Sequence, residues 1–141
     1  MAIHFIEEDR SPENFKRGIV KKWLEGVIRK EGKEVGITNI IFCSDRYLLK
    51  INKEFLKRDY LTDVITFDYT ENAKISGDIL ISIDRTGENA SEMGISGIDE
   101  LKRVMVHGVL HLIGYNDDTS ENKAEMTSRE DQYLGQWVEG G

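Results

Sequence analysis

The spacing of apolar residues predicts strands and helices that follow one another along the chain. Residues 2–8, AIHFIEE, have the length and apolar content of a first strand. Ser11, Pro12 and Glu13 then form a helix-start signature, because a capping hydroxyl, an early proline and an acid all suit the positive end of a helix. An apolar residue recurs every four positions through this expected helix, which Gly32 ends: Phe15, Ile19, Trp23 and Val27.

The middle of the chain predicts three more strands and a second helix. Residues 36–44, GITNIIFCS, are rich in β-branched residues, and Ser44 can cap a helix that runs to about Phe55. Two further runs of β-forming residues lie at 63–69, DVITFDY, and at 77–83, GDILISI.

The last third of the chain is mainly helical. Residues 84–94 fit a short, weakly amphipathic helix or a loop, and two longer helices follow, from Ile98 to Ile113 and from about Ser120 to Trp137. The second of these directs four side chains inward: Met126, Tyr133, Leu134 and Trp137. Strands and helices mingle without regular βαβ alternation, which favours a small α+β or mixed α/β layer fold.

Length and composition fit one domain spanning residues 1–141. At 39% hydrophobic residues the chain can bury a core without a disulfide, and its lone Cys43 cannot form one internally. The N-terminus turns acidic after six residues and lacks a signal-peptide pattern, so a cytoplasmic protein is expected. The longest uncharged stretch, Val104 to Asn116, is shorter than the ~20 apolar residues of a membrane span, so no membrane association is expected.

The net charge of −7 argues against non-specific binding to nucleic acid, which depends on clustered lysine and arginine. Two groups of basic residues would still permit a local basic patch, although the sequence alone favours a solvated helix face for both. They are Lys16, Arg17, Lys21 and Lys22, and Lys50, Lys53, Lys57 and Arg58.

Two of the three histidines lie in the most apolar helix. His107 and His111 are the only polar side chains between Val104 and Ile113, and their i, i+4 spacing puts them on one face, with Cβ atoms ~5–6 Å apart. Burying an imidazole without a partner costs about 2–7 kcal/mol, and one divalent metal would satisfy both rings. Gly114 then allows a reversal that could return an acid to the metal. On spacing alone, a structural pair bonded to backbone carbonyls remains an alternative.

A metal held by two histidines and one acid would be a catalytic rather than a structural site. Structural zinc normally has four protein ligands, often cysteines, whereas three ligands leave a position open for water. The spacing also resembles that of metalloproteases, but the position of their general-base glutamate is Gly108 here. Peptide hydrolysis therefore lacks its base.

The stretch HGVLHLIGYND, residues 107–117, resembles the signature H-G-x-L-H-L-x-G-Y-D-H of the YbeY-type endoribonucleases. The resemblance extends to INKEF and LTDVITF upstream, to GDILIS, and to Met126 and Glu130 after the motif. It covers the chain from Ile51 onward, and four linked motifs in the right order make it specific.

The resemblance implies a mostly parallel sheet of about four strands packed with several helices, one of them a metzincin-like metal helix. It also implies a metal-dependent endoribonuclease that acts on single-stranded rRNA precursor, with the ribosome or a small-subunit assembly intermediate as partner. The ligands carried over are His107, His111 and, in place of the family's third histidine, Asp117, with Asp118 as the alternative. The metal expected is one Zn²⁺ per chain, although another divalent ion would also suit these ligands.

At other positions the family pattern gives weaker indications of which residues act. The family's substrate-contacting arginine is Leu56 here, so Arg58 is the candidate catalytic guanidinium, and the proline before T-D-V is Leu61. Asp63 and Asp78 are candidate general acids only because they lie within the motifs. Two other functions stay open: a ribosome-associated binding protein with a structural metal, and a metal hydrolase of another substrate.

Overall fold

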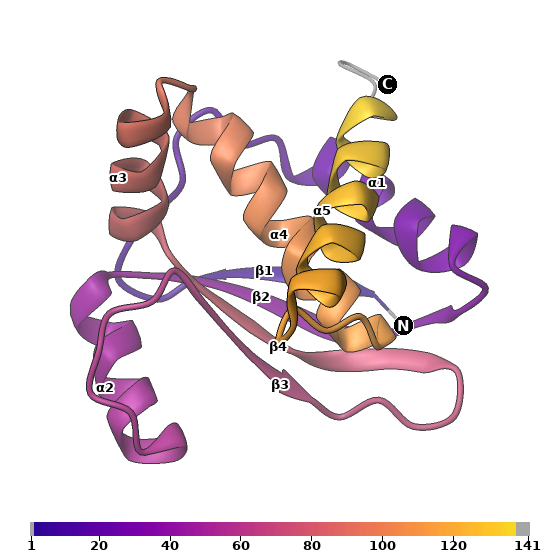
Figure 1. The fold of residues 1–141 in the computed structure, drawn as a ribbon, viewed down its shortest axis with the longest axis horizontal. Coiled ribbons are helices and arrows are strands. Elements are labelled where there is room, and N and C mark those ends of the chain that lie inside the picture. Colours follow the sequence, from indigo (N-terminus) through magenta and orange to yellow (C-terminus); the bar gives the residue numbers. More distant parts are fainter. Residues whose placement is uncertain (1, 138–141) are drawn as a thin grey trace.

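A computed structural model describes residues 2–137, in which five helices surround a four-stranded sheet (Figure 1). In chain order the elements are β1 (Ile3–Glu7), α1 (Arg17–Lys30), β2 (Glu34–Cys43), α2 (Asp45–Leu56), β3 (Val64–Asp68), β4 (Lys74–Ser82), α3 (Ile83–Met93), α4 (Gly97–Ile113) and α5 (Ser120–Gly135).

The sheet has the strand order β1-β2-β4-β3, so β2 and β4 form its centre. β1 and β4 both run parallel to β2, while β3 pairs with β4 in the antiparallel sense. Ile40 of β2 lies opposite Ile79 of β4, and both side chains are fully buried. The prediction of a small α+β fold with a mostly parallel sheet is confirmed.

The helices cover the two faces of the sheet unequally. Figure 1 shows α4 crossing one face with α1 and α5 beside it, whereas α2 lies on the opposite face. Helix α4 is buried on nearly every side, as its apolar composition predicts. On the far face α2 closes a smaller apolar cluster of four buried residues, Cys43, Leu48, Ile65 and Leu80. Within residues 2–137, none of the helices has the length and apolarity needed to cross a membrane.

The predicted start of the first helix is wrong. Helix α1 begins at Arg17 rather than near Ser11, whose hydroxyl donates instead to the Glu7 carboxylate at 2.5 Å. Asn14 has a φ of +56°, in the left-handed region, so a right-handed helix cannot run through it. Phe15 therefore lies outside the helix, and its ring packs edge-on against Phe5 and Phe42, with centroids 4.9 and 5.2 Å apart.

The other helix boundaries lie close to the predicted ones. Residues 83–93 form a helix, for which the Ser82 hydroxyl accepts a hydrogen bond from the Arg85 backbone N–H. Helix α5 ends at Gly135, two residues earlier than expected. Trp137 follows the helix and packs edge-on against Trp23, with ring centroids 5.0 Å apart.

Replacing Gly108 by alanine should destabilise the protein. A Cβ at this position would lie 2.7 Å from Cγ2 of Ile79, a buried side chain that cannot move without disturbing β4. Overpacking of this kind costs about 1–3 kcal/mol, so chemical denaturation of Gly108→Ala should show that loss. Gly26→Ala in α1 is the control, because its Cβ would meet nothing within 4 Å and should stabilise the helix by about 0.5–1 kcal/mol. Equal effects of the two substitutions would contradict the packing argument.

Candidate metal centre

Helix α4 brings His107 and His111 onto one face, where their Nε2 atoms lie 3.1 Å apart. Asp117, in the loop after the helix, completes the cluster. Its Oδ2 lies 3.4 Å from Nε2 of His107 and 3.5 Å from Nε2 of His111. The three side chains are half-buried and offer one nitrogen or oxygen atom each, all within 4.8 Å of one another.

These distances fit the coordination shell of a tetrahedral metal ion. Zinc binds imidazole nitrogen and carboxylate oxygen at ~2.0–2.2 Å, which in a tetrahedron separates neighbouring ligand atoms by roughly 3.3–3.5 Å. The three observed separations cluster around that value. The donors are of the types that zinc and other divalent transition metals accept, and three protein ligands leave a fourth position for water.

The loop that bears Asp117 is tied to the helices at both ends. Gly114 has a φ of +126° and donates its N–H to the Leu110 carbonyl, which reverses the chain after α4. The Tyr115 hydroxyl donates to Glu31 at 2.6 Å. Asp118, the alternative ligand, points elsewhere, since its carboxylate accepts a hydrogen bond from Asn122 at 2.7 Å. The fold thus places Asp117, not Asp118, beside the histidines.

A buried carboxylate orients the first histidine. Glu130 of α5, only 6% exposed, lies 2.6 Å from Nδ1 of His107 through its Oε2 atom. Its other oxygen accepts a hydrogen bond from Arg103 at 2.8 Å, and Arg103 also donates to Asp131 at 2.8 Å. A carboxylate at this distance places the proton on Nδ1, which leaves the lone pair of Nε2 facing His111 and Asp117.

The two histidines differ in acidity because their surroundings differ. Burial lowers the pKa of His107, but the hydrogen bond and the negative charge of Glu130 outweigh it, and the pKa lies above its ordinary value. For His111 burial again lowers the pKa, the neighbouring His107 lowers it further, and the result lies below the ordinary value. His107, which is bonded to Glu130, therefore holds a proton more strongly than His111 does.

Metal affinity should fall as the pH is lowered from 8 to 6. Only a neutral imidazole coordinates, so a proton competes with the ion for His107. Because the pKa of His107 is raised, this competition begins at a higher pH than for an ordinary histidine. Below that pKa the apparent affinity should drop about tenfold per pH unit, measured by competition with a chromophoric chelator. An affinity that is constant over this range would contradict coordination through His107.

A cavity of about 440 Å³ opens in front of the three candidate ligands. Its walls include Arg58 and Asp63, so the fold brings both of these sequence-predicted residues to the cluster. Asp78 is not among the residues that line this cavity. It lies on β4, where its carboxylate accepts a hydrogen bond from Asn39 at 3.0 Å.

His107 and Asp117 also line a second, smaller cavity. It measures about 250 Å³ and is lined in part by Asp63, Glu100 and Glu130. Glu100 is buried, and among the described residues its Oε1 has no hydrogen-bond partner. Burial raises the pKa of this carboxyl, and the nearby charge of Asp63 raises it further.

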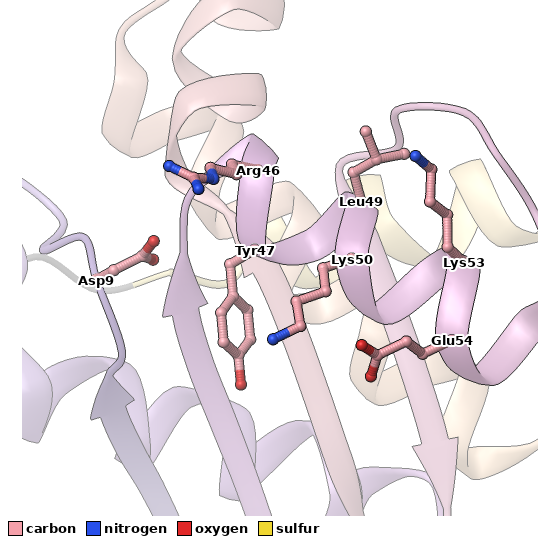
Figure 2. A pocket seen from close by; sticks show the side chains of 7 residues that line it. All are labelled: Asp9, Arg46, Tyr47, Leu49, Lys50, Lys53 and Glu54. Atoms are coloured by element: carbon pink, nitrogen blue, oxygen red, sulfur yellow. The ribbon is translucent and has the colours of Figure 1, made fainter.

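The basic cluster of residues 50–58 is divided between two surfaces. Arg58 lines the cavity at the histidines, whereas Lys50 and Lys53 line a separate cavity of about 580 Å³ on the α2 side of the sheet. Figure 2 shows Tyr47 and Lys50 extending from α2 into this separate cavity on the α2 side. None of its lining residues lines the cavity at the histidines, so this larger pocket is not part of the candidate metal centre.

Sequence reasoning assigned no role to Glu130 or Arg103. The sequence does hold a signal for the first of them. Met126 and Tyr133 were expected to face inward, and Glu130 lies on the same helix face, four residues after one and three before the other. An acid on a buried stripe needs a buried partner, and here the partners are His107 and Arg103.

Comparison with known proteins agrees with these features. The family model described as Endoribonuclease YbeY matches residues 3–138. Endoribonuclease YbeY of Cytophaga hutchinsonii is 46% identical over 134 residues, covering 94% of each chain, and that of Flavobacterium psychrophilum is 50% identical over 112 residues, covering 79% of this chain and 80% of that protein. The solution structure of a Thermotoga maritima protein superposes with a TM-score of 0.67 at 29% identity, covering 96% of this chain and 91% of that one. The chain belongs to the endoribonuclease YbeY family.

Proposed function

We propose that this protein is a zinc-dependent endoribonuclease that cleaves single-stranded rRNA precursor in the cytoplasm, on the ribosome or a small-subunit assembly intermediate. The observation that supports this most is the cluster of His107, His111 and Asp117, whose spacing fits a metal with one open position at the wall of a cavity. The names of the relatives support RNA as the substrate.

In the proposed reaction the residues of the site would have the following roles. His107, His111 and Asp117 hold the metal, which when bound supplies a Lewis acid and an acidified water. Glu130 fixes the ring of His107, and the hydrogen bond from Arg103 holds the Glu130 carboxylate in place. Arg58 faces the same cavity and binds a phosphate of the RNA, two hydrogen bonds at a time where the geometry allows.

Two routes of cleavage are compatible with this site, and the products distinguish them. Attack of water on phosphorus leaves a phosphate on the 5′ end of the downstream fragment. Attack by the ribose 2′-OH leaves a 2′,3′-cyclic phosphate on the upstream fragment. End-group analysis of a cleaved single-stranded RNA, beside a substrate with 2′-deoxyribose at the scissile position, tests both the activity and the route. Absence of cleavage by zinc-loaded protein on rRNA precursor would overturn the proposed function.

Arg58→Ala should weaken binding of RNA more than it slows the chemical step. Among the described residues the Arg58 guanidinium has no ion pair. The neighbouring carboxylate, Asp59, pairs with Lys53 at 3.4 Å instead. Losing a charge-assisted contact to phosphate should raise KM roughly 10- to 100-fold and reduce the salt dependence by about one counterion. Arg46→Ala, which removes a guanidinium from the separate α2 cavity, is the control and should leave KM unchanged. The same KM for both variants would show that Arg58 does not contact the RNA.

A further inference from the structure

Tyr60 is an aromatic side chain that lines the cavity at the histidines yet remains 54% exposed. It lies in the segment between α2 and β3, two residues after Arg58. Large aromatic rings are usually buried or bonded through the hydroxyl. Tyr47, Tyr115 and Tyr133 follow that rule here, each at least half-buried, whereas more than half of the Tyr60 surface is open to solvent.

The backbone that bears Tyr60 is held in place by a buried amide. Asn52 of α2 is only 1% exposed, and its Nδ2 donates to the carbonyl of Tyr60 at 2.9 Å. The backbone carbonyl of Asn52 accepts the N–H of Arg58 at 3.1 Å. One buried side chain and its own carbonyl therefore fix both ends of the turn. The backbone that carries the ring and the guanidinium to the cavity is thus tied to α2 by two hydrogen bonds.

An exposed aromatic side chain, together with a guanidinium in the same cavity that has no ion pair among residues 2–137, suits single-stranded nucleic acid. Each base of an unpaired strand offers a π-face that stacks on tyrosine, and the adjoining phosphate offers a charge to arginine. The bases of a duplex are already stacked within the helix and cannot reach such a ring. A protein with a net charge of −7 must also gain much of its RNA affinity from a few local contacts.

We propose that Tyr60 is a stacking subsite for one unpaired nucleobase of the RNA, next to the phosphate bound by Arg58. The proposal rests on the proposed function and adds to it the reason for a single-stranded substrate. With one base on Tyr60 and one phosphate on Arg58, the strand is fixed in register as it passes His107, His111 and Asp117. A duplex must first unstack a base to bind in this way.

Binding of a short single-stranded oligoribonucleotide to metal-free protein tests the subsite without cleavage. Tyr60→Ala should weaken binding roughly 5- to 100-fold, as loss of one stacked base does elsewhere, while Tyr60→Phe and Tyr60→Trp should retain it. Tyr60→Leu, which keeps bulk and apolarity without a π-face, should not restore full affinity. The matched control is Tyr69→Ala, since Tyr69 is 60% exposed on the segment after β3 and lines none of the cavities described above.

A fluorescent base gives a second readout that a merely structural role would not change. Oligonucleotides with 2-aminopurine at successive positions should be quenched at one position by wild-type protein and at none by Tyr60→Ala. In zinc-loaded protein the same variant should raise KM with kcat within about twofold of wild type. Unchanged affinity, equal losses in the Tyr60 and Tyr69 variants, or quenching that persists without the ring would each overturn the subsite.

The two proposals can fail separately. If wild-type protein binds and quenches the probe but zinc-loaded protein cleaves no RNA, the subsite stands and the proposed endoribonuclease activity falls. If zinc-loaded protein cleaves single-stranded RNA and Tyr60→Ala cleaves it with the same KM, the activity stands and the subsite falls.

Discussion

Asp117→Ala should lose the metal while the fold is kept. Wild-type protein supplied with zinc should contain about one ion per chain by elemental analysis, and the variant should bind it more than about 100-fold less tightly. Changes to groups outside the ligand shell already cost 10- to 100-fold, and here a ligand itself is removed. Asp117 lies on an exposed loop and contacts the two histidines, so its loss leaves the core intact and the circular dichroism spectrum unchanged. RNA cleavage should fall to background.

Asp118→Ala is the matched control for this experiment. It removes a carboxylate from the neighbouring position, where the side chain bonds to Asn122 rather than facing His107 and His111. Metal content and cleavage should both stay near wild-type values. If Asp118→Ala loses the metal and Asp117→Ala keeps it, the third ligand is wrongly assigned. If Asp117→Ala instead unfolds the protein, the metal is structural, and the interpretation as a ribosome-associated binding protein gains support.

Glu130→Ala should weaken metal binding roughly 10- to 100-fold although Glu130 does not touch the ion. Without the carboxylate nothing fixes the proton on Nδ1 of His107, so the ring samples the tautomer in which Nε2 is protonated and cannot coordinate. The substitution also leaves Arg103 with Asp131 alone, which should destabilise the fold by about 1–3 kcal/mol. Competition with a chromophoric chelator gives the affinity, and urea denaturation gives the stability.

Two further variants separate orientation from charge at this position. Glu130→Gln keeps an oxygen that can accept from Nδ1 but loses the negative charge, so its metal affinity should fall between those of wild type and Glu130→Ala. Asp131→Asn weakens the other partner of Arg103 and should change stability without changing metal affinity. Nitrogen-15 chemical shifts of the imidazole report the tautomer of His107 directly. A wild-type tautomer in Glu130→Ala would contradict the orienting role.

The sequence was sufficient to predict those features that depend on one short segment of the chain. Helix α4 runs from Gly97 to Ile113, one residue from the predicted start, because its apolar composition and the glycine after it are properties of the segment itself. The same holds for α2, whose cap at Ser44 was predicted and whose hydroxyl accepts the Tyr47 N–H at 3.1 Å. The cluster of His107, His111 and Asp117 was equally predictable, since a stretch of eleven residues with one turn contains all three.

Features that depend on distant segments were not predictable in this way. Phe15 fits the helical spacing of α1, yet it lies before the helix, where its ring packs against Phe5 and Phe42. The basic run from Lys50 to Arg58 gives no sign that α2 ends within it, with Lys57 in the left-handed conformation. Because of this helix end, basic side chains of the run line two different cavities. The partnership of Glu130 with His107 spans 23 residues and exists only once α5 packs beside α4.

The close approach of Gly108 to Ile79 restricts which chemistry this helix can acquire. A metalloprotease-type glutamate at position 108 would have to occupy space that Cγ2 of Ile79 already fills, since even a Cβ there would lie 2.7 Å away. One substitution cannot therefore convert the site to a peptidase. A smaller residue at position 79 would have to arise first, and it would remove volume from the centre of the sheet at a cost of about 2–5 kcal/mol before any benefit appeared. A single van der Waals contact thus acts as an evolutionary barrier between two enzyme classes that share the same pair of histidines.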